Sequence, residues 1–309
     1  MRRIPRMLVP CLCLFAAAAP PAEEVFRDRE FAGGFNVSAI SAKAKPLELG
    51  VILQNKEGAK NEWRLAQWGT QFDLKAAPLK TLPDGTRIVR NTGKSVKVFS
   101  GGLTGEGIML GVNGGAEFGG VARKAGQFWP HLLLEQQIPK DFRISELASL
   151  AFHVDFRVEQ CKNAIDATLD PALHTAHVTA FLTLNNRNPS NPDNGEMIWF
   201  GVPLFDARSD VPPGHQAADV AVENGKFIYT VEGSRFFEGP TGDGEWQKVA
   251  CDLVPFIKEA LAASQEKGFM VHTKFEDLYA TSFNLGWEVP GPYNCEITLK
   301  NLSLDRVAR

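Results

Sequence analysis

Two glutamates stand in segments whose neighbouring residues suit acid–base chemistry. The first, Glu196, follows a long polar loop and begins the stretch Glu196–Phe200, in which the remaining residues are large and apolar. A carboxyl group in apolar surroundings has a raised pKa unless it is solvated or paired, and such a group suits proton transfer. A hydrated glutamate at the end of a strand explains the same pattern, so both interpretations stay open.

The second glutamate, Glu288, follows Gly286 and Trp287 near the end of the chain. A glycine lets the backbone pass close to a ligand. An indole beside a carboxyl group suits a sugar, because the ring covers the apolar face of the sugar while the acid acts on its oxygens. The alternative is a tryptophan that covers the core beside an exposed glutamate.

The elements that must position these residues are predicted to be short strands. Twelve apolar or alternating runs lie between turn signals such as Asp84-Gly85 and Asn224-Gly225, and this spacing favours an all-β sandwich or jelly roll over a parallel sheet with crossover helices. The runs are Leu47–Leu53, Ile88–Arg90, Val96–Phe99, Gly107–Val112, Trp129–Leu134, Leu150–Phe156, His177–Leu184, Glu196–Phe200, Lys226–Val231, Trp246–Val249, Ala280–Leu285 and Glu296–Leu302. One amphipathic helix is predicted over Asp252–Lys267, covering the outer face of a sheet.

The first residues read as a secretory signal peptide rather than as part of the fold. A basic start is followed by the apolar run Met7–Phe15 and by four alanines, a run too short to span a bilayer. Cleavage is expected after Ala18, with Ala22 as the alternative. We therefore expect a signal peptide over 1–18, a single β-sandwich domain over 19–309, and a secreted or periplasmic protein.

Composition excludes several classes of protein. The 309 residues are 44% hydrophobic with a formal net charge of −3, which argues against disorder and against a nucleic-acid partner. No cofactor, metal or membrane span is expected, and the protein is expected to be a monomer. Cys161, Cys251 and Cys295 remain after cleavage, which allows at most one internal disulfide, whose pairing the sequence leaves open.

The order of these segments resembles glycoside hydrolase family 12, the concanavalin A-like jelly-roll endoglucanases, over about 126–304. The segments that carry the resemblance are Gly126–His131, Ile138-Pro139, Ile144–Leu147, Ala176–Leu184, Glu196–Trp199, Asp252–Leu261, Gly286–Glu288 and Cys295–Leu304. The resemblance implies an all-β sandwich of two antiparallel sheets with one covering helix. It also implies a retaining endo-acting hydrolase of a β-linked, β-glucan-like glycan, with Glu196 as nucleophile and Glu288 as acid/base.

Five further residues are candidates for contacting the glycan on the concave sheet. The aromatic ones are Trp129, Trp199 and Trp287, and the polar ones are His131 and Glu135. The family has one residue more between its nucleophile and the following Met, and its Asp on the neighbouring strand has no counterpart within 177–181. These departures favour a rival interpretation, a carbohydrate-binding sandwich that uses the same face without cutting the glycan.

Two other interpretations have less support from the residue types. A polysaccharide lyase needs a Tyr or His base beside charge-neutralising groups, and no tyrosine lies in a recognisable basic cluster. His174 and His177 have a spacing seen in metal sites, but no third ligand is near in the sequence, so a polar strand edge is favoured there.

Overall fold

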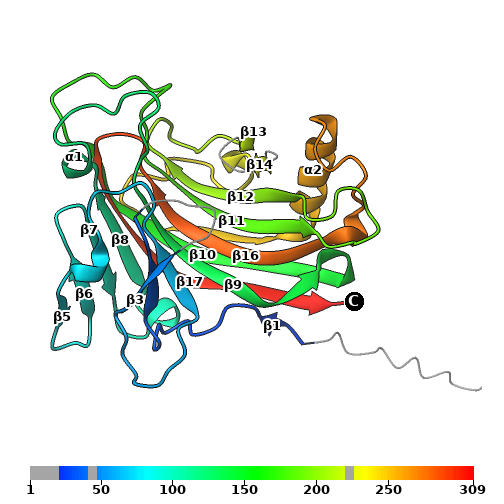
Figure 1. The fold of residues 1–309 in the computed structure, drawn as a ribbon, viewed down its shortest axis with the longest axis horizontal. Helices are drawn as coiled ribbons and strands as arrows, with labels where there is room; N and C mark the ends of the chain where they lie inside the picture. Colours follow the sequence, from blue (N-terminus) through cyan, green and yellow to red (C-terminus); the bar gives the residue numbers. More distant parts are fainter. Residues whose placement is uncertain (1–20, 41–46, 220–225) are drawn as a thin grey trace, which may run out of the picture.

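Two β-sheets packed face to face form the body of the protein (Figure 1), seen in a computed structural model that describes residues 21–40, 47–219 and 226–309. Sheet A contains, in spatial order, β15 (Gln247–Asp252), β10 (Leu147–Asn163), β17 (Tyr293–Ala308), β8 (Ile108–Asn113), β7 (Lys94–Val98), β6 (Arg87–Arg90) and β5 (Leu79–Thr81), with β1 (Glu23–Glu24) beside β17. Sheet B contains β13 (His215–Asp219), β14 (Lys226–Thr230), β12 (Met197–Asp206), β11 (His177–Asn186), β16 (Leu278–Glu288), β9 (His131–Arg143), β4 (Trp63–Ala66), β2 (Phe35–Ser38) and β3 (Glu48–Ile52).

Helical segments are few and short in the described chain. The α-helices are α1 (Gly114–Glu117) and α2 (Leu253–Glu266), and the 3-10 turns are η1 (Leu74–Ala76), η2 (Gly102–Thr104), η3 (Ile144–Glu146), η4 (Gly233–Arg235) and η5 (Phe275–Asp277). The predicted all-β jelly-roll sandwich is therefore confirmed, and each of the twelve predicted runs overlaps a strand. Two strand pairs, β12 with β14 and β2 with β4, are parallel, so the sheets are not purely antiparallel.

The N-terminal region supplies outer strands to both sheets. Strands β2, β3 and β4 extend sheet B beyond β9, while β5 to β8 extend sheet A beyond β17. The predicted signal peptide lies outside the described residues.

Strict alternation along the central strands explains where the core lies. In β11 the residues Val178, Ala180, Leu182 and Leu184 are buried between the sheets, and in β10 the same holds for Leu150, Phe152, Val154 and Phe156. Successive side chains of a strand point to opposite faces, so the residues between those of β11 point away from sheet A. We call this the outer face of sheet B.

Helix α2 closes one side of the sandwich. Its N-cap is Asp252, whose carboxylate accepts a hydrogen bond from the Val254 backbone N–H at 3.1 Å, and its buried face includes Ile257 and Ala260. The helix contacts β10 of sheet A and both β12 and β14 of sheet B. It therefore bridges the two layers at their margin, where the sequence predicted that it covers the outer face of one sheet.

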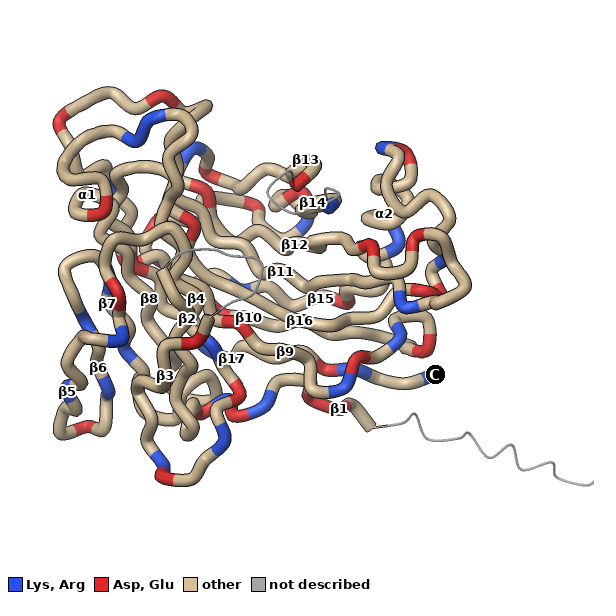
Figure 2. Tube along the Cα trace, viewed as in Figure 1, with Lys and Arg blue, Asp and Glu red and all other residues tan. Residues whose placement is uncertain are grey.

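Charged residues of both signs are interspersed along the trace (Figure 2), as a net charge of −3 over 309 residues suggests. No helix in the described residues is long and apolar enough to cross a membrane.

Candidate functional site

Three adjacent strands place three titratable side chains in one row on the outer face of sheet B. Glu288 ends β16, His131 begins β9 and His177 begins β11, and in the register of the sheet Glu288 is directly opposite both histidines. Directly opposed residues on neighbouring strands have their Cβ atoms about 4.5–5.5 Å apart, so the three side chains must interact.

Gly286 allows β16 to lie close to β9 just before Glu288. A Cβ atom at this position would lie 2.2 Å from the Leu132 carbonyl oxygen and 2.9 Å from the Leu133 Cα. Both are backbone atoms that cannot move aside, so only glycine fits at this point of contact. The glycine that the sequence associated with a ligand therefore contacts the neighbouring strand.

The Glu288 carboxylate is held through one of its two oxygens. Oε2 accepts hydrogen bonds from His131 Nε2 at 3.1 Å and from Trp129 Nε1 at 3.5 Å, and it lies 3.8 Å from His177 Nε2. No hydrogen bond or ion pair within the described residues involves Oε1. The side chains of Glu288, His131 and His177 are 23%, 21% and 26% exposed, so the cluster is recessed but open to solvent.

His131 is fixed at both of its ring nitrogens. Nδ1 donates to the Trp129 carbonyl oxygen at 3.0 Å and Nε2 donates to Glu288. Each ring nitrogen thus faces an oxygen atom that can accept a hydrogen bond, and the orientation of the ring is fixed from both sides. Its ring also stacks on the Trp129 indole, with 5.9 Å between ring centroids, and the guanidinium of Arg123 lies 5.2 Å from the centroid of that indole.

The electrostatics of the cluster keep Glu288 ionised. Burial by itself would raise the pKa of Glu288, but the charges and hydrogen bonds of His131 and His177 hold that pKa well below its usual value. Burial would lower the pKa of His177, whereas the hydrogen bonding and charge of Glu288 outweigh this effect and raise it. A general acid must hold a proton when the leaving group departs, so the resting state of Glu288 does not suit that role.

Two polar ring nitrogens on the same face have no hydrogen-bond partner among the described residues. They are His177 Nδ1 and Trp199 Nε1, and both are shielded from solvent. Trp199 alternates along β12 with the buried Ile198 and Phe200, so it lies on the outer face, where its ring meets Phe181 edge to face. Buried polar groups are nearly always paired, and orphans of this kind mark places where a ligand or water completes the bonding.

Glu135 lies on the same face, four residues along β9 from His131. The Arg64 guanidinium of β4 contacts its Oε2 through two nitrogens, each at 2.5 Å. Burial raises the pKa of Glu135, and the charge and hydrogen bonds of Arg64 oppose that shift. Both residues line a cavity of about 250 Å³ at the β2–β4–β9 end of the sheet, together with Asn36, Glu48, Lys60, Asn61, Glu62, Trp63, Gln137 and Pro139.

Glu196 does not converge with Glu288, which corrects the pairing predicted from the sequence. The Glu196 carbonyl oxygen accepts a hydrogen bond from the Asn186 N–H at the last residue of β11, whereas Glu288 is opposite His177 at the first. The two glutamates are thus nine residues of β11 apart, about 30 Å at the rise of a strand. Glu196 instead pairs with Lys226, at 3.3 Å between Nζ and Oε2.

Trp287 is also misplaced by the sequence analysis. It is 0% exposed, its Nε1 donates to the Leu110 carbonyl oxygen of sheet A at 3.0 Å, and its ring packs against Phe205. Strand alternation explains the error, because Glu288 on the outer face requires its neighbour to point into the core. Trp287 therefore does not contact a ligand on the outer face.

The residue that the sequence missed is His177. Its neighbour in the suggested metal spacing, His174, is buried, and its Nε2 donates to the Arg123 carbonyl oxygen at 2.8 Å. Among the described residues no group of three or more His, Cys, Asp and Glu side chains is arranged to hold a metal ion. Asp206, opposite His177 on β12, is occupied by Arg208 at 2.6 Å and by Thr175 at 2.8 Å.

Glycoside hydrolases are among the solved structures that the chain resembles. They include a family 12 xyloglucanase from Bacillus licheniformis (10% identity, 74% of this chain and 97% of that chain, TM-score 0.44) and a family 12 endoglucanase from Trichoderma harzianum (11%, 81% and 100%, TM-score 0.38). A family 11 xylanase from Neocallimastix patriciarum is also similar (11%, 77% and 98%, TM-score 0.38). No family model matches the chain, and no curated protein matches it. Family 12 hydrolases are thus among the solved structures that the chain is distantly similar to, as the sequence resemblance predicted, and this likeness assigns neither an activity nor a catalytic residue to this chain.

Proposed function

We propose that the outer face of sheet B binds a polysaccharide chain, with Glu288 at the centre of the binding site. The observation that carries the proposal is the state of the Glu288 carboxylate, which is kept ionised and fixed through Oε2 while Oε1 has no partner in the described residues. Such an oxygen is a strong acceptor for the hydroxyl groups of a sugar.

The surroundings of Glu288 suit the rest of a glycan. Trp129 offers its indole ring beside Glu288, and rings of this kind cover the apolar side of a sugar. Trp199 is opposite Thr183, about 20 Å along β11 from Glu288, and offers a second ring for a more distant unit of the same glycan chain. The unpartnered donors His177 Nδ1 and Trp199 Nε1 supply the complementary hydrogen-bond groups. A few placed polar groups among aromatic rings are the usual composition of a small-molecule or glycan site.

Binding without the retaining two-glutamate mechanism is the form that the geometry favours. Retaining hydrolysis needs two carboxyl groups about 5–5.5 Å apart. Glu196 and Glu288 lie at opposite ends of β11, and Glu288 is already ionised by its histidines. We also propose that the protein acts outside the cytoplasm, because residues 1–18 have the composition of a signal peptide.

Affinity electrophoresis in native gels that contain mixed-linkage β-glucan, xyloglucan or xylan tests the proposal. Glu288→Gln removes the charge with little change of shape, and we expect it to weaken binding by about tenfold or more, the effect of losing charge-assisted hydrogen bonds. Glu196→Gln is the matched control and should migrate like the parent protein. The proposal is wrong if no glycan retards the parent, or if both variants are retarded equally.

Hydrolysis is the second candidate, and one specific observation favours it. Glu135 and Glu288 lie on adjacent strands of the same face, and their surroundings shift their pKa values in opposite directions. Carboxyl groups with separated pKa values are the usual arrangement of an acid and a base. Glu135 is opposite Asn284, four residues along β16 from Glu288, so the two backbones are about 13 Å apart.

An assay for reducing ends, run beside the gels, separates the two candidates. Release of reducing ends that both Glu135→Gln and Glu288→Gln abolish, and that Glu196→Gln preserves, would establish hydrolysis. Retardation without new reducing ends supports binding alone.

A further inference from the structure

Two of the three cysteines in the described residues face each other across a strand pair of sheet A. In the antiparallel register of β10 with β17, Cys161 is the direct partner of Cys295. Directly opposed residues of such a pair have Cα atoms about 4.5–5.5 Å apart, and a disulfide accepts Cα separations of about 4.4–6.8 Å. The backbone is therefore already at the spacing that a disulfide between these residues needs.

The two side chains also point to the same side of the sheet. Cys295 is 1% exposed and belongs to the core, with its Sγ 3.8 Å from the Val112 carbonyl oxygen, while Cys161 is partly buried and packs against the same core. Opposed residues share a face of the sheet, so both thiols lie between the layers and only Cys161 has contact with solvent.

Cys251 is far from both of them. It lies on β15 opposite Phe152, which is nine residues along β10 from Cys161, a distance of about 30 Å. Among the three pairings that the sequence left open, only one joins residues that the fold places together.

We propose that Cys161 and Cys295 form an oxidation site that a small disulfide, such as oxidised glutathione, converts into a cross-strand disulfide linking β10 to β17. The partly exposed Cys161 loses its proton and attacks a sulfur of oxidised glutathione, which forms a mixed disulfide and releases one glutathione. Cys295 then loses its proton and attacks the Cys161 sulfur, and the second glutathione leaves. The two cysteines lose two electrons, and one oxidised glutathione is reduced to two molecules of glutathione.

The reaction is expected to be slow at neutral pH and faster in alkali. Burial raises the pKa of the Cys161 thiol to about 12, so only a small fraction of it is ionised near pH 7. The thiolate is the attacking species, so at pH values below this pKa the rate should rise about tenfold for each unit by which the pH increases.

Peptide mapping of the folded protein tests this site. The reduced protein, produced without residues 1–18 so that Cys161, Cys251 and Cys295 are its cysteines, is incubated with oxidised glutathione at pH 8.5. Its remaining thiols are then alkylated, and the digest is analysed by mass spectrometry without reductant. We expect one linked peptide pair that contains Cys161 and Cys295, and an alkylated Cys251. The oxidised protein should also melt higher than the reduced one, by roughly 5–10 °C for a loop of this length.

Three variants make the outcome decisive. Cys251→Ser should leave the linked pair unchanged, while Cys161→Ser and Cys295→Ala should each remove it. Cys161 is partly exposed and tolerates serine. The Cys161→Ser variant therefore still tests the linkage if a substitution at the buried Cys295 prevents folding. Complete alkylation of Cys161 in the folded, oxidised protein, or a linkage that includes Cys251, would overturn the proposal.

Discussion

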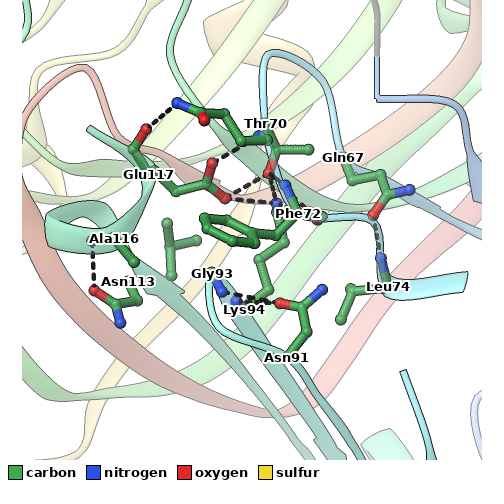
Figure 3. A network of polar contacts seen from close by, with 12 residues as sticks. Gln67, Thr70, Phe72, Leu74, Asn91, Gly93, Lys94, Asn113, Ala116 and Glu117 are labelled. Atoms are coloured by element: carbon green, nitrogen blue, oxygen red, sulfur yellow. Dashed lines mark hydrogen bonds and ion pairs between the residues drawn. The ribbon is translucent and has the colours of Figure 1, made fainter. Parts of the chain in front are cut away.

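Two clusters of charged side chains differ in how completely their hydrogen bonds are satisfied. The first joins Lys94 of β7 to Glu117 of α1 at 2.9 Å, and these side chains are 0% and 1% exposed (Figure 3). The second is the Glu288 cluster on the outer face of sheet B, whose side chains are about a quarter exposed. Both clusters place a carboxylate beside cationic groups, yet their remaining contacts are quite different.

In the buried cluster every charged atom has a partner. The Lys94 ammonium donates to Glu117 Oε1, to the Thr70 hydroxyl and to the Phe72 carbonyl oxygen. These three bonds use all three N–H donors of the ammonium. Glu117 Oε2 accepts from the Gln71 N–H at 2.8 Å. A saturated network of this kind has no group left for a ligand, and its role is to attach the loop around Thr70 to β7 and α1.

The Glu288 cluster is left incomplete by comparison. Its Oε1 and the Nδ1 of His177 have no partner in the described residues. The two clusters therefore differ in their unused donors and acceptors and not in the pairing of their carboxylates.

The largest effect is expected from breaking the buried pair. Lys94→Met leaves the Glu117 charge buried and uncompensated, and this should lower the free energy of unfolding by about 3–5 kcal/mol. Urea unfolding followed by tryptophan fluorescence measures it. The double variant Lys94→Met with Glu117→Leu should recover most of the loss, because no charge then remains buried. A single variant within 1 kcal/mol of the parent would show that the pair is not the constraint described here.

A smaller, pH-dependent effect on stability is expected at the Glu288 cluster. The pKa of Glu288 is lowered, so its contribution to stability is present above its ordinary pKa of 4.5 and is lost as the pH falls through the lowered value. The pKa of His177 is raised, so its contribution is present below its ordinary 6.5 and is lost as the pH rises through the raised value.

The stability difference between the parent protein and Glu288→Gln should therefore be largest between about pH 4.5 and 6.5, and it should shrink on either side. We expect about 1 kcal/mol at its maximum, because the groups remain partly solvated. Unfolding free energies of the parent and of Glu288→Gln, measured at pH 5.5 and pH 8.5, test whether this difference is larger at the lower pH. An equal difference at both values would rule out the coupling of Glu288 to His177.

The smallest effect is expected at the other predicted glutamate. The side chains of Glu196 and Lys226 are 32% and 16% exposed, and exposed pairs of this kind contribute about 0–1 kcal/mol. Glu196→Gln should change the unfolding free energy by less than 1 kcal/mol and leave glycan retardation unchanged. Loss of retardation in this variant would move the centre of the binding site to the other end of β11.

Twelve of the strands were predictable because each of the twelve runs carries its own alternation or apolar run and its own turn residues, whereas β1, β2, β4, β5 and β13 were not predicted. The position of Glu288 was predictable in part, since Gly286 and Trp287 indicate a constrained strand end. The inward orientation of the Trp287 side chain follows from strand alternation in β16 once Glu288 is assigned to the outer face. The side chain was nevertheless expected at the site, because tryptophan beside glutamate suits a sugar in isolation.

The separation of Glu196 from Glu288 could not be predicted from the sequence, because it depends on the register of β11 with both β12 and β16. Glu196 lies in the connection between β11 and β12, while Glu288 lies at the far end of β16, and no local pattern contains that relation. His177 was missed for the same reason, since its significance comes from a residue more than a hundred positions away.

The close approach at Gly286 has a consequence for how this protein tolerates change. A single methyl group there would act as a wedge between β16 and β9, because it would meet the Leu132 carbonyl oxygen at 2.2 Å. The strands would separate two residues before Glu288, and the carboxylate would be carried away from the imidazole of His131. A position without any side chain thus governs the alignment of the charged row, and its replacement by alanine would disable the site while leaving each of its polar residues intact.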